Sequence, residues 1–87
     1  MNRKDMSRKK YQRKRKIEIG ISRPEIGRRI RMLRGFDMKQ KEFGQKLGIT
    51  QSMVSRLEKG EIPSVELLLK ISEVFGKSTD WILKGEG

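Results

Sequence analysis

The segment Gln40–Gly60, QKEFGQKLGITQSMVSRLEKG, constrains the fold of this chain more than any other stretch. Phe43 and Leu47 are spaced to lie on one face of a short helix. Gly48 follows, and a glycine supplies the positive φ that a tight turn requires. Thr50 is then placed to cap a second helix. The segment therefore predicts two short amphipathic helices joined by a tight turn.

The flanking sequence predicts three further helices, because each has a start signal followed by a glycine that ends it. Ser22 opens a capping box before a helix that runs to about Arg34. We expect Gly35 to end this helix in the left-handed conformation. Ser64 and Ser78 are the N-caps expected for the last two helices.

Positive charge is concentrated at the start of the chain. The 22 Lys and Arg residues outnumber the 11 Asp and Glu residues, so the formal net charge is +11. Residues 1–22 alone hold nine basic and two acidic residues, a net charge of +7. Like charges repel at this density, so we divide the chain into a disordered basic arm, residues 1–21, and a compact all-α domain of five helices, residues 22–87. The charge favours a polyanionic partner, either nucleic acid or an anionic membrane.

Several classes of function lack their usual side chains. The chain contains neither cysteine nor histidine, which removes His/Cys zinc sites, thiol nucleophiles and histidine acid–base catalysis. We therefore expect no metal, no cofactor, no small-molecule substrate and no enzymatic activity. The chain has no apolar run of about 18 residues that would span a membrane, and its basic start lacks the apolar stretch of a secretory signal. We expect a cytoplasmic protein without a membrane partner.

Residues 26–85 resemble the Cro/phage-repressor helix-turn-helix family, also called the XRE family, of bacterial and phage regulators. The matching stretches are Ile26 to Ile30, Gln40, Phe43-Gly44, Leu47 to Thr50, Val54-Ser55, Leu57 to Gly60, Pro63-Ser64, Leu68, Ile71 and Asp80 to Leu83. The resemblance implies a five-helix domain whose third helix, about 51–59, docks in the major groove of double-stranded DNA. It also implies a dimeric, nucleoid-associated transcriptional regulator, which we expect to act as a repressor.

The side chains of this third helix are the candidates for reading DNA. A major groove about 12 Å wide admits one α-helix, and the carboxamide of Gln51 can pair with N6 and N7 of adenine. The resemblance places Gln51 where bases are read, and Ser52 and Arg56 where bases or nearby phosphates are contacted. Ser55 is an adjacent candidate for a phosphate contact, and Met53 is a candidate for contact with a thymine methyl group. Three alternatives stay open. Gln51 can simply be a solvated residue at the start of the helix. Arg56 can pair with a neighbouring carboxylate, and Met53 can be a local packing residue.

The second helix, about 40–47, is expected to hold the DNA backbone. Its unpaired N–H groups around Gln40 attract anions such as phosphate. The resemblance implies that Gln40 bridges a phosphate and Gln51, with solvent exposure as the alternative. Lys39, Lys41 and Lys59 flank this surface and would add non-specific attraction, or remain solvated charges.

Other positions are expected to have structural roles. The resemblance implies an ion pair between Arg34 and Glu58 that fixes how the helices meet. It also places Gly44 where alanine is usual, so glycine is expected to fit there while weakening the helix by about 1 kcal/mol. Trp81 and Leu83 are candidate contacts of a homodimer, although Trp81 can instead complete the core.

Two other functions stay open at the level of sequence. The chain can be an antitoxin that regulates its own transcription, with the basic arm binding a toxin. It can also bind RNA through that arm, although RNA-binding modules usually display stacking aromatic residues and this chain has five aromatic residues in total. The arm itself can wrap DNA or enter its minor groove, or act as a non-specific polycation.

Overall fold

A computed structural model describes residues 20–87, and within that range the chain forms five α-helices and no β-strand. The helices are α2 (Arg23–Arg34), α3 (Gln40–Leu47), α4 (Gln51–Glu58), α5 (Val65–Phe75) and α6 (Thr79–Lys84). The predicted all-α domain of five helices is confirmed over these residues. The predicted basic arm, residues 1–21, lies outside the described residues except for its last two positions.

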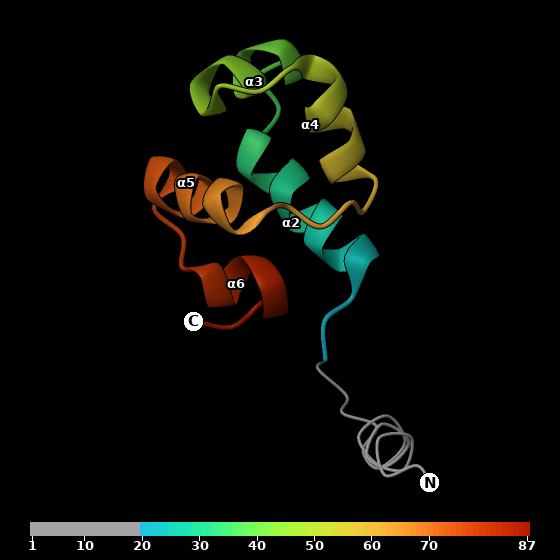
Figure 1. Ribbon diagram of the computed structural model, residues 1–87, viewed down its shortest axis with the longest axis vertical. Helices are drawn as coiled ribbons and strands as arrows, with labels where there is room; N and C mark the ends of the chain where they lie inside the picture. Colours follow the sequence, from blue (N-terminus) through green and yellow to red (C-terminus); the bar gives the residue numbers. More distant parts are fainter. Residues whose placement is uncertain (1–19) are drawn as a thin grey trace, which may run out of the picture.

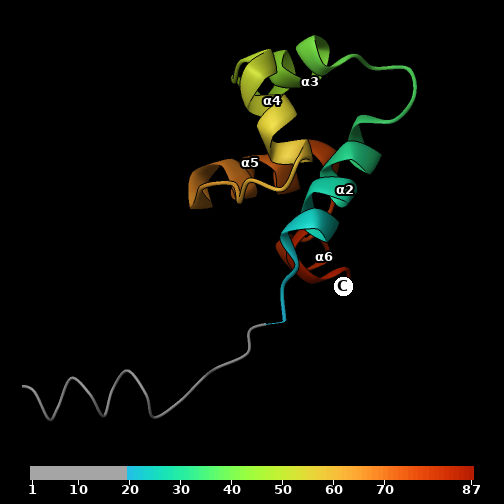
Figure 2. The same ribbon diagram turned by 90° about the vertical axis from the view of Figure 1, so that its right-hand side faces the viewer.

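The longest helix, α2, lies between the two ends of the domain (Figure 1). It packs against both α4 and α6, while α5 contacts both α3 and α6. The view turned by 90° shows α3 and α4 together on one side of α2, away from α6 (Figure 2). One core joins the five helices, and its fully buried side chains are Ile26, Ile30, Phe43, Leu47, Val54, Leu57, Ile71 and Ile82.

Four predicted helix caps are present. The hydroxyl oxygens of Ser22, Thr50, Ser64 and Ser78 each accept a hydrogen bond from the backbone N–H three residues later, at 3.0–3.4 Å. Each bond satisfies one of the four N–H groups that a helix start leaves unpaired. These short-range signals explain why the sequence predicts the helix starts closely.

The end of α2 corrects the prediction for Gly35. This glycine has a positive φ of 72°, but its ψ of −169° is not the left-handed helical conformation. Arg31 Nη1 donates to the carbonyl oxygen of Gly35 at 2.9 Å, and Arg34 Nη1 donates to that of Met38 at 3.0 Å. These arginines bind backbone carbonyls on both sides of the turn, so the chain leaves α2 in an extended direction.

Gly27 marks the closest approach of α2 to the end of α4. A Cβ atom on Gly27 would lie 2.6 Å from the carbonyl oxygen of Glu58 and 3.0 Å from the backbone nitrogen of Gly60. Gly27→Ala must therefore push the helices apart, at a cost that exceeds the gain in helix propensity. We expect the free energy of unfolding to fall by about 1–2 kcal/mol in urea titrations followed by circular dichroism.

The control for this substitution is Met32→Ala on the same helix, where the side chain is 61% exposed. This change should alter the free energy of unfolding by less than about 0.5 kcal/mol. An unfolding midpoint of Gly27→Ala equal to that of the unsubstituted protein would contradict the close approach.

Candidate nucleic-acid interface

The turn between α3 and α4 is built on two glycines. Gly48 adopts the left-handed conformation, with φ 73° and ψ 29°, as predicted. The backbone N–H of Ile49 donates to the carbonyl oxygen of Gly44 at 2.9 Å. A Cβ atom on Gly44 would lie 2.6 Å from the carbonyl oxygen of Ile49. Glycine therefore fits this close contact, as expected, whereas a methyl group at position 44 would require the backbone at Ile49 to shift.

One face of α4 is fixed by the core and the other is open. Val54 and Leu57 are fully buried, and Thr50 caps the helix start at 3.1 Å from the backbone nitrogen of Met53. Because both buried side chains lie on one face, the opposite face of the helix is held toward solvent. Its predicted candidates are exposed or partly exposed, namely Gln51, Ser52, Met53, Ser55 and Arg56.

Arg56 has a carboxylate partner, as the alternative interpretation proposes. Its Nε atom lies 3.3 Å from Glu61 Oε1, and its Nη2 atom lies 3.7 Å from the sulfur of Met53. Both charged side chains of the pair are largely exposed, at 59% and 44%. Exposed ion pairs contribute little free energy, so the guanidinium can exchange Glu61 for a phosphate or a base. Met53 also packs against the core, which supports local packing for this residue.

The start of α3 carries two exposed cations, Lys39 and Lys41. Lys39 is the N-cap, and its side chain has no atom that accepts a hydrogen bond. Glu42 Oε1 instead accepts a bond from the backbone nitrogen of Lys39 at 2.9 Å, which is one half of a capping box. The side chain of Lys39 is thus not used for capping. Lys59, the residue after α4, is exposed as well.

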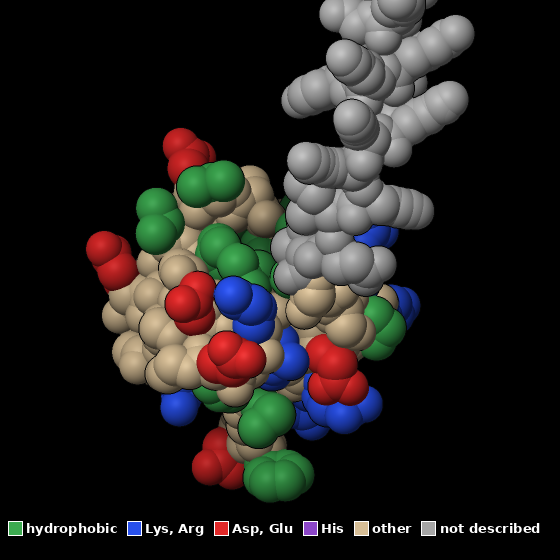
Figure 3. All heavy atoms as spheres, turned by 90° about the horizontal axis from the view of Figure 1, so that it is seen from below, with side chains coloured by type: hydrophobic (Ala, Val, Ile, Leu, Met, Phe, Trp, Pro, Cys, Tyr) green, Lys and Arg blue, Asp and Glu red, His purple; other side chains and the backbone are tan. Residues whose placement is uncertain are grey.

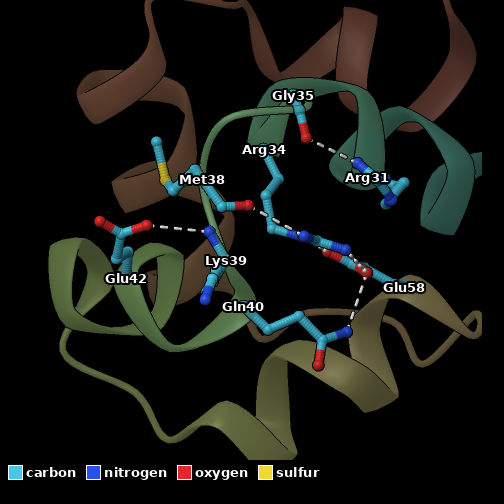
Figure 4. A network of polar contacts seen from close by, with 8 residues as sticks. All are labelled: Arg31, Arg34, Gly35, Met38, Lys39, Gln40, Glu42 and Glu58. Atoms are coloured by element: carbon cyan, nitrogen blue, oxygen red, sulfur yellow. Dashed lines mark hydrogen bonds and ion pairs between the residues drawn. The ribbon is translucent and has the colours of Figure 1, made fainter.

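Gln40 contacts Glu58 rather than the predicted Gln51. Its Nε2 atom donates to Glu58 Oε1 at 3.0 Å (Figure 4). A bond from an amide to a carboxylate is charge-assisted and is stronger than one between two neutral carboxamides. This bond ties the first residue of α3 to the last residue of α4, and the bridge from Gln40 to Gln51 and a phosphate stays a prediction.

The ion pair between Arg34 and Glu58 is present and bidentate. Arg34 Nε lies 2.7 Å from Glu58 Oε2, and Arg34 Nη2 lies 3.0 Å from Glu58 Oε1. The two side chains are only 14% and 9% exposed. With the bond from Gln40, the carboxylate of Glu58 joins three helices (Figure 4). Sequence reasoning provides the pair by resemblance, but it misses Gln40 as the third member.

Glu58 stays charged in this setting. Burial raises the pKa of its carboxyl group, but hydrogen bonds from Arg34 and Gln40 and the positive charge of Arg34 outweigh burial. The net result is a pKa below the ordinary glutamate value. The hydrogen bond with Glu58 in turn raises the pKa of Arg34. The pair is therefore fully ionised at neutral pH.

Comparison with known proteins places this arrangement in a family. A helix-turn-helix family model matches residues 28–82, which is more than half of the chain. This chain is a member of the helix-turn-helix family. A crystal structure of the P22 c2 repressor protein, in complex with synthetic operator 9T in the presence of Tl+, matches with a TM-score of 0.64 and 33% identity. That match covers 70% of this chain and 96% of the repressor chain, and it confirms the resemblance to the Cro/phage-repressor type.

A second helix-turn-helix relative is longer than this chain. It is an uncharacterized HTH-type transcriptional regulator of Haemophilus influenzae (strain ATCC 51907 / DSM 11121 / KW20 / Rd), 46% identical over 46 residues. The match covers 52% of this chain but only 19% of the relative. The aligned part thus spans about a fifth of that regulator.

The candidate dimer residues of this helix-turn-helix chain lie on α6, at the other end of the domain from α4 (Figure 1). Trp81 and Leu83 are both partly buried and pack against the core. The ammonium group of Lys77 lies 4.8 Å from the centroid of the Trp81 ring. Trp81 therefore completes the core in part and keeps some exposed surface. Seen from this end, hydrophobic side chains are interspersed with charged ones (Figure 3).

Among residues 20–87, no group of three or more acidic side chains gathers in a way that could hold a metal ion. Within the same range, no helix combines the length and apolar character that crossing a bilayer requires.

Proposed function

We propose that this chain binds double-stranded DNA in a sequence-specific manner by placing α4 in the major groove. The main support is the open face of α4, which carries polar side chains on a helix fixed by Val54 and Leu57. A second support is the shared fold with a repressor whose structure was solved with its operator. In this proposal the chain regulates transcription, and it represses by occupying the operator.

Each candidate residue has a role that fits its position. Gln51, at the exposed start of α4, reads adenine through its carboxamide. Ser52 and Arg56 contact bases or nearby phosphates, and Ser55 contacts a phosphate. The first turn of α3 at Gln40 binds a phosphate through its unpaired N–H groups. Additional phosphate attraction, independent of base sequence, comes from Lys39, Lys41, Lys59 and the basic arm, residues 1–21.

We also propose that two copies of the chain bind together as a homodimer through α6. The partly exposed Trp81 and Leu83 supply the contact. A two-fold dimer would place its two α4 helices in successive major grooves, about 34 Å apart along the duplex. The operator would then be a pair of inverted half-sites.

The test is an unbiased selection of duplex DNA by the full chain, followed by affinity measurements at several salt concentrations. We expect an inverted repeat to be enriched and to bind at least about 10³-fold more tightly than random duplex. Raising the salt should weaken both complexes, because phosphate contacts release counterions. Equal affinity for every duplex at all salt concentrations would refute sequence-specific recognition. An enriched single half-site would refute the dimer alone.

A further inference from the structure

Arg29 links two helices that are distant in the sequence. Its Nη1 atom donates to the carbonyl oxygen of Ile82 at 2.9 Å, across 53 residues of chain. This carbonyl belongs to the last turn of α6, where carbonyl groups have no partner within the helix. The positive charge of Arg29 also suits the negative end of that helix. A Cβ atom on Gly85, the residue that ends α6, would lie 3.0 Å from Arg29 Nη2, so the guanidinium lies against this glycine.

The same helix, α2, is tightly connected to α4. Arg34 forms the bidentate ion pair with Glu58, and Gly27 brings the α2 backbone against the carbonyl of that same glutamate. Contacts therefore run from α4 through α2 to α6, and α2 lies between the other two helices (Figure 1).

Helix α6 depends on these contacts for its orientation. It has only six residues, far fewer than the roughly 12–15 that an isolated helix needs in water. Ile82 is its one fully buried side chain, while Trp81 and Leu83 pack against the core with part of their surface exposed. The bond from Arg29 acts on the backbone of Ile82 and opposes tilting of α6 against the core.

We propose that Arg29 is a positioning residue that sets the half-site spacing accepted by the dimer. This inference rests on the proposed function, in which α6 joins two copies and α4 reads DNA. In such a dimer, the separation of the two α4 helices is determined by how α6 is held against α2. One added base pair moves a half-site by about 3.4 Å and rotates it by about 35°, since a turn of about 34 Å contains 10–10.5 base pairs. A rigid dimer cannot follow that change, whereas a dimer with a loosened α6 can.

The experiment compares three substitutions in the full chain. Arg29→Met removes the donor and keeps most of the side-chain volume, and Arg29→Lys restores the positive charge and one donor. Arg28→Met is the matched control, because Arg28 is 65% exposed and pairs with Glu25, on its own helix, at 3.3 Å. Fluorescence anisotropy gives the affinity of each protein for duplexes with the selected spacing, with one base pair added or removed, and with one half-site only.

The unsubstituted chain and Arg28→Met should lose at least about tenfold in affinity when the spacing changes by one base pair, because the DNA must twist to fit. Arg29→Met should lose no more than about threefold in affinity when the spacing changes by one base pair. Its affinity for a single half-site should stay within about twofold of that of the unsubstituted chain, because α4 keeps its own contacts. Arg29→Lys should be intermediate. Urea titration checks that each variant is folded. If Arg29→Met does not fold, the spacing dependence of Arg29→Lys is compared with that of Arg28→Met instead.

A purely structural role for Arg29 predicts equal losses on every duplex and an unchanged dependence on spacing. That result overturns the inference while leaving the proposed function intact. If the unsubstituted chain discriminates no spacing because it prefers no duplex, the proposed function fails, and the inference fails with it.

Discussion

Replacing Glu58 by alanine is expected to lower the free energy of unfolding by about 3 kcal/mol at neutral pH. The substitution leaves the Arg34 guanidinium, whose side chain is only 14% exposed, without its carboxylate. It also leaves Gln40 Nε2 without its acceptor. A domain of this size is marginally stable, at about 0.05–0.15 kcal/mol per residue, so the loss is a large share of the total. Urea unfolding followed by circular dichroism measures it.

The matched control is Glu25→Ala in the exposed pair with Arg28, which should cost less than about 1 kcal/mol. Glu58→Gln keeps an acceptor for Gln40 and removes the charge, so its loss should be intermediate. If Glu58→Ala and Glu25→Ala were equally stable, the partly buried ion pair would not be holding the three helices together.

Acid should erase the difference between the unsubstituted chain and Glu58→Ala. The folded-state pKa of Glu58 is depressed, so its stabilising contribution is present above the ordinary glutamate pKa of about 4.3. That contribution is lost as the pH falls through the folded-state value. Unfolding curves of the two proteins should therefore converge as the pH falls from the ordinary glutamate pKa through the depressed folded-state value. A constant difference down to strongly acidic pH would show that the charge of Glu58 does not matter.

The sequence predicts the parts of this fold that depend on neighbours along the chain. Caps such as Thr50 and turns such as Gly48 act within three or four residues, so their residue types are informative by themselves. The conformation of Gly35 is different, because the side chains of Arg31 and Arg34 fix the carbonyls around it. Long arginine side chains have many possible acceptors, and sequence alone does not choose among them.

In the candidate site, too, features set by neighbours along the chain are predictable from the sequence, and features set by distant contacts are not. The exposure of Gln51 and Ser52 follows from the helical spacing of Val54 and Leu57 in the core. The bond from Gln40 to Glu58 depends instead on the crossing of α3 and α4, which sequence spacing does not give. The role of Arg29 cannot be derived from spacing, because its partner is a backbone carbonyl 53 residues away. Every residue has a backbone carbonyl, so the residue type at position 82 does not indicate that its carbonyl accepts this bond.

Gln51→Ala is expected to reduce the preference for the selected operator over random duplex by about 10- to 100-fold, since a bidentate contact to a base contributes about 1–3 kcal/mol of discrimination. Stability should hardly change, because Thr50 still caps α4 and alanine is a good helix former. The salt dependence of binding should also stay the same, because no phosphate contact is removed. Anisotropy titrations with both duplexes at several salt concentrations measure the preference and its salt dependence, and urea unfolding measures the stability. Gln45→Ala, an exposed glutamine on α3, is the matched control and should leave the preference unchanged.

The adenine contact itself can be tested from the DNA side. If Gln51 pairs with N6 and N7, replacing the contacted adenine by 7-deazaadenine should weaken binding of the unsubstituted chain and leave Gln51→Ala unaffected. The two changes are then non-additive, as expected for groups in direct contact. The opposite result would be an unchanged preference in Gln51→Ala together with complete loss of binding when Arg15 and Lys16 of the basic arm become alanine. Recognition would then belong to the arm, and α4 would serve only as part of the scaffold.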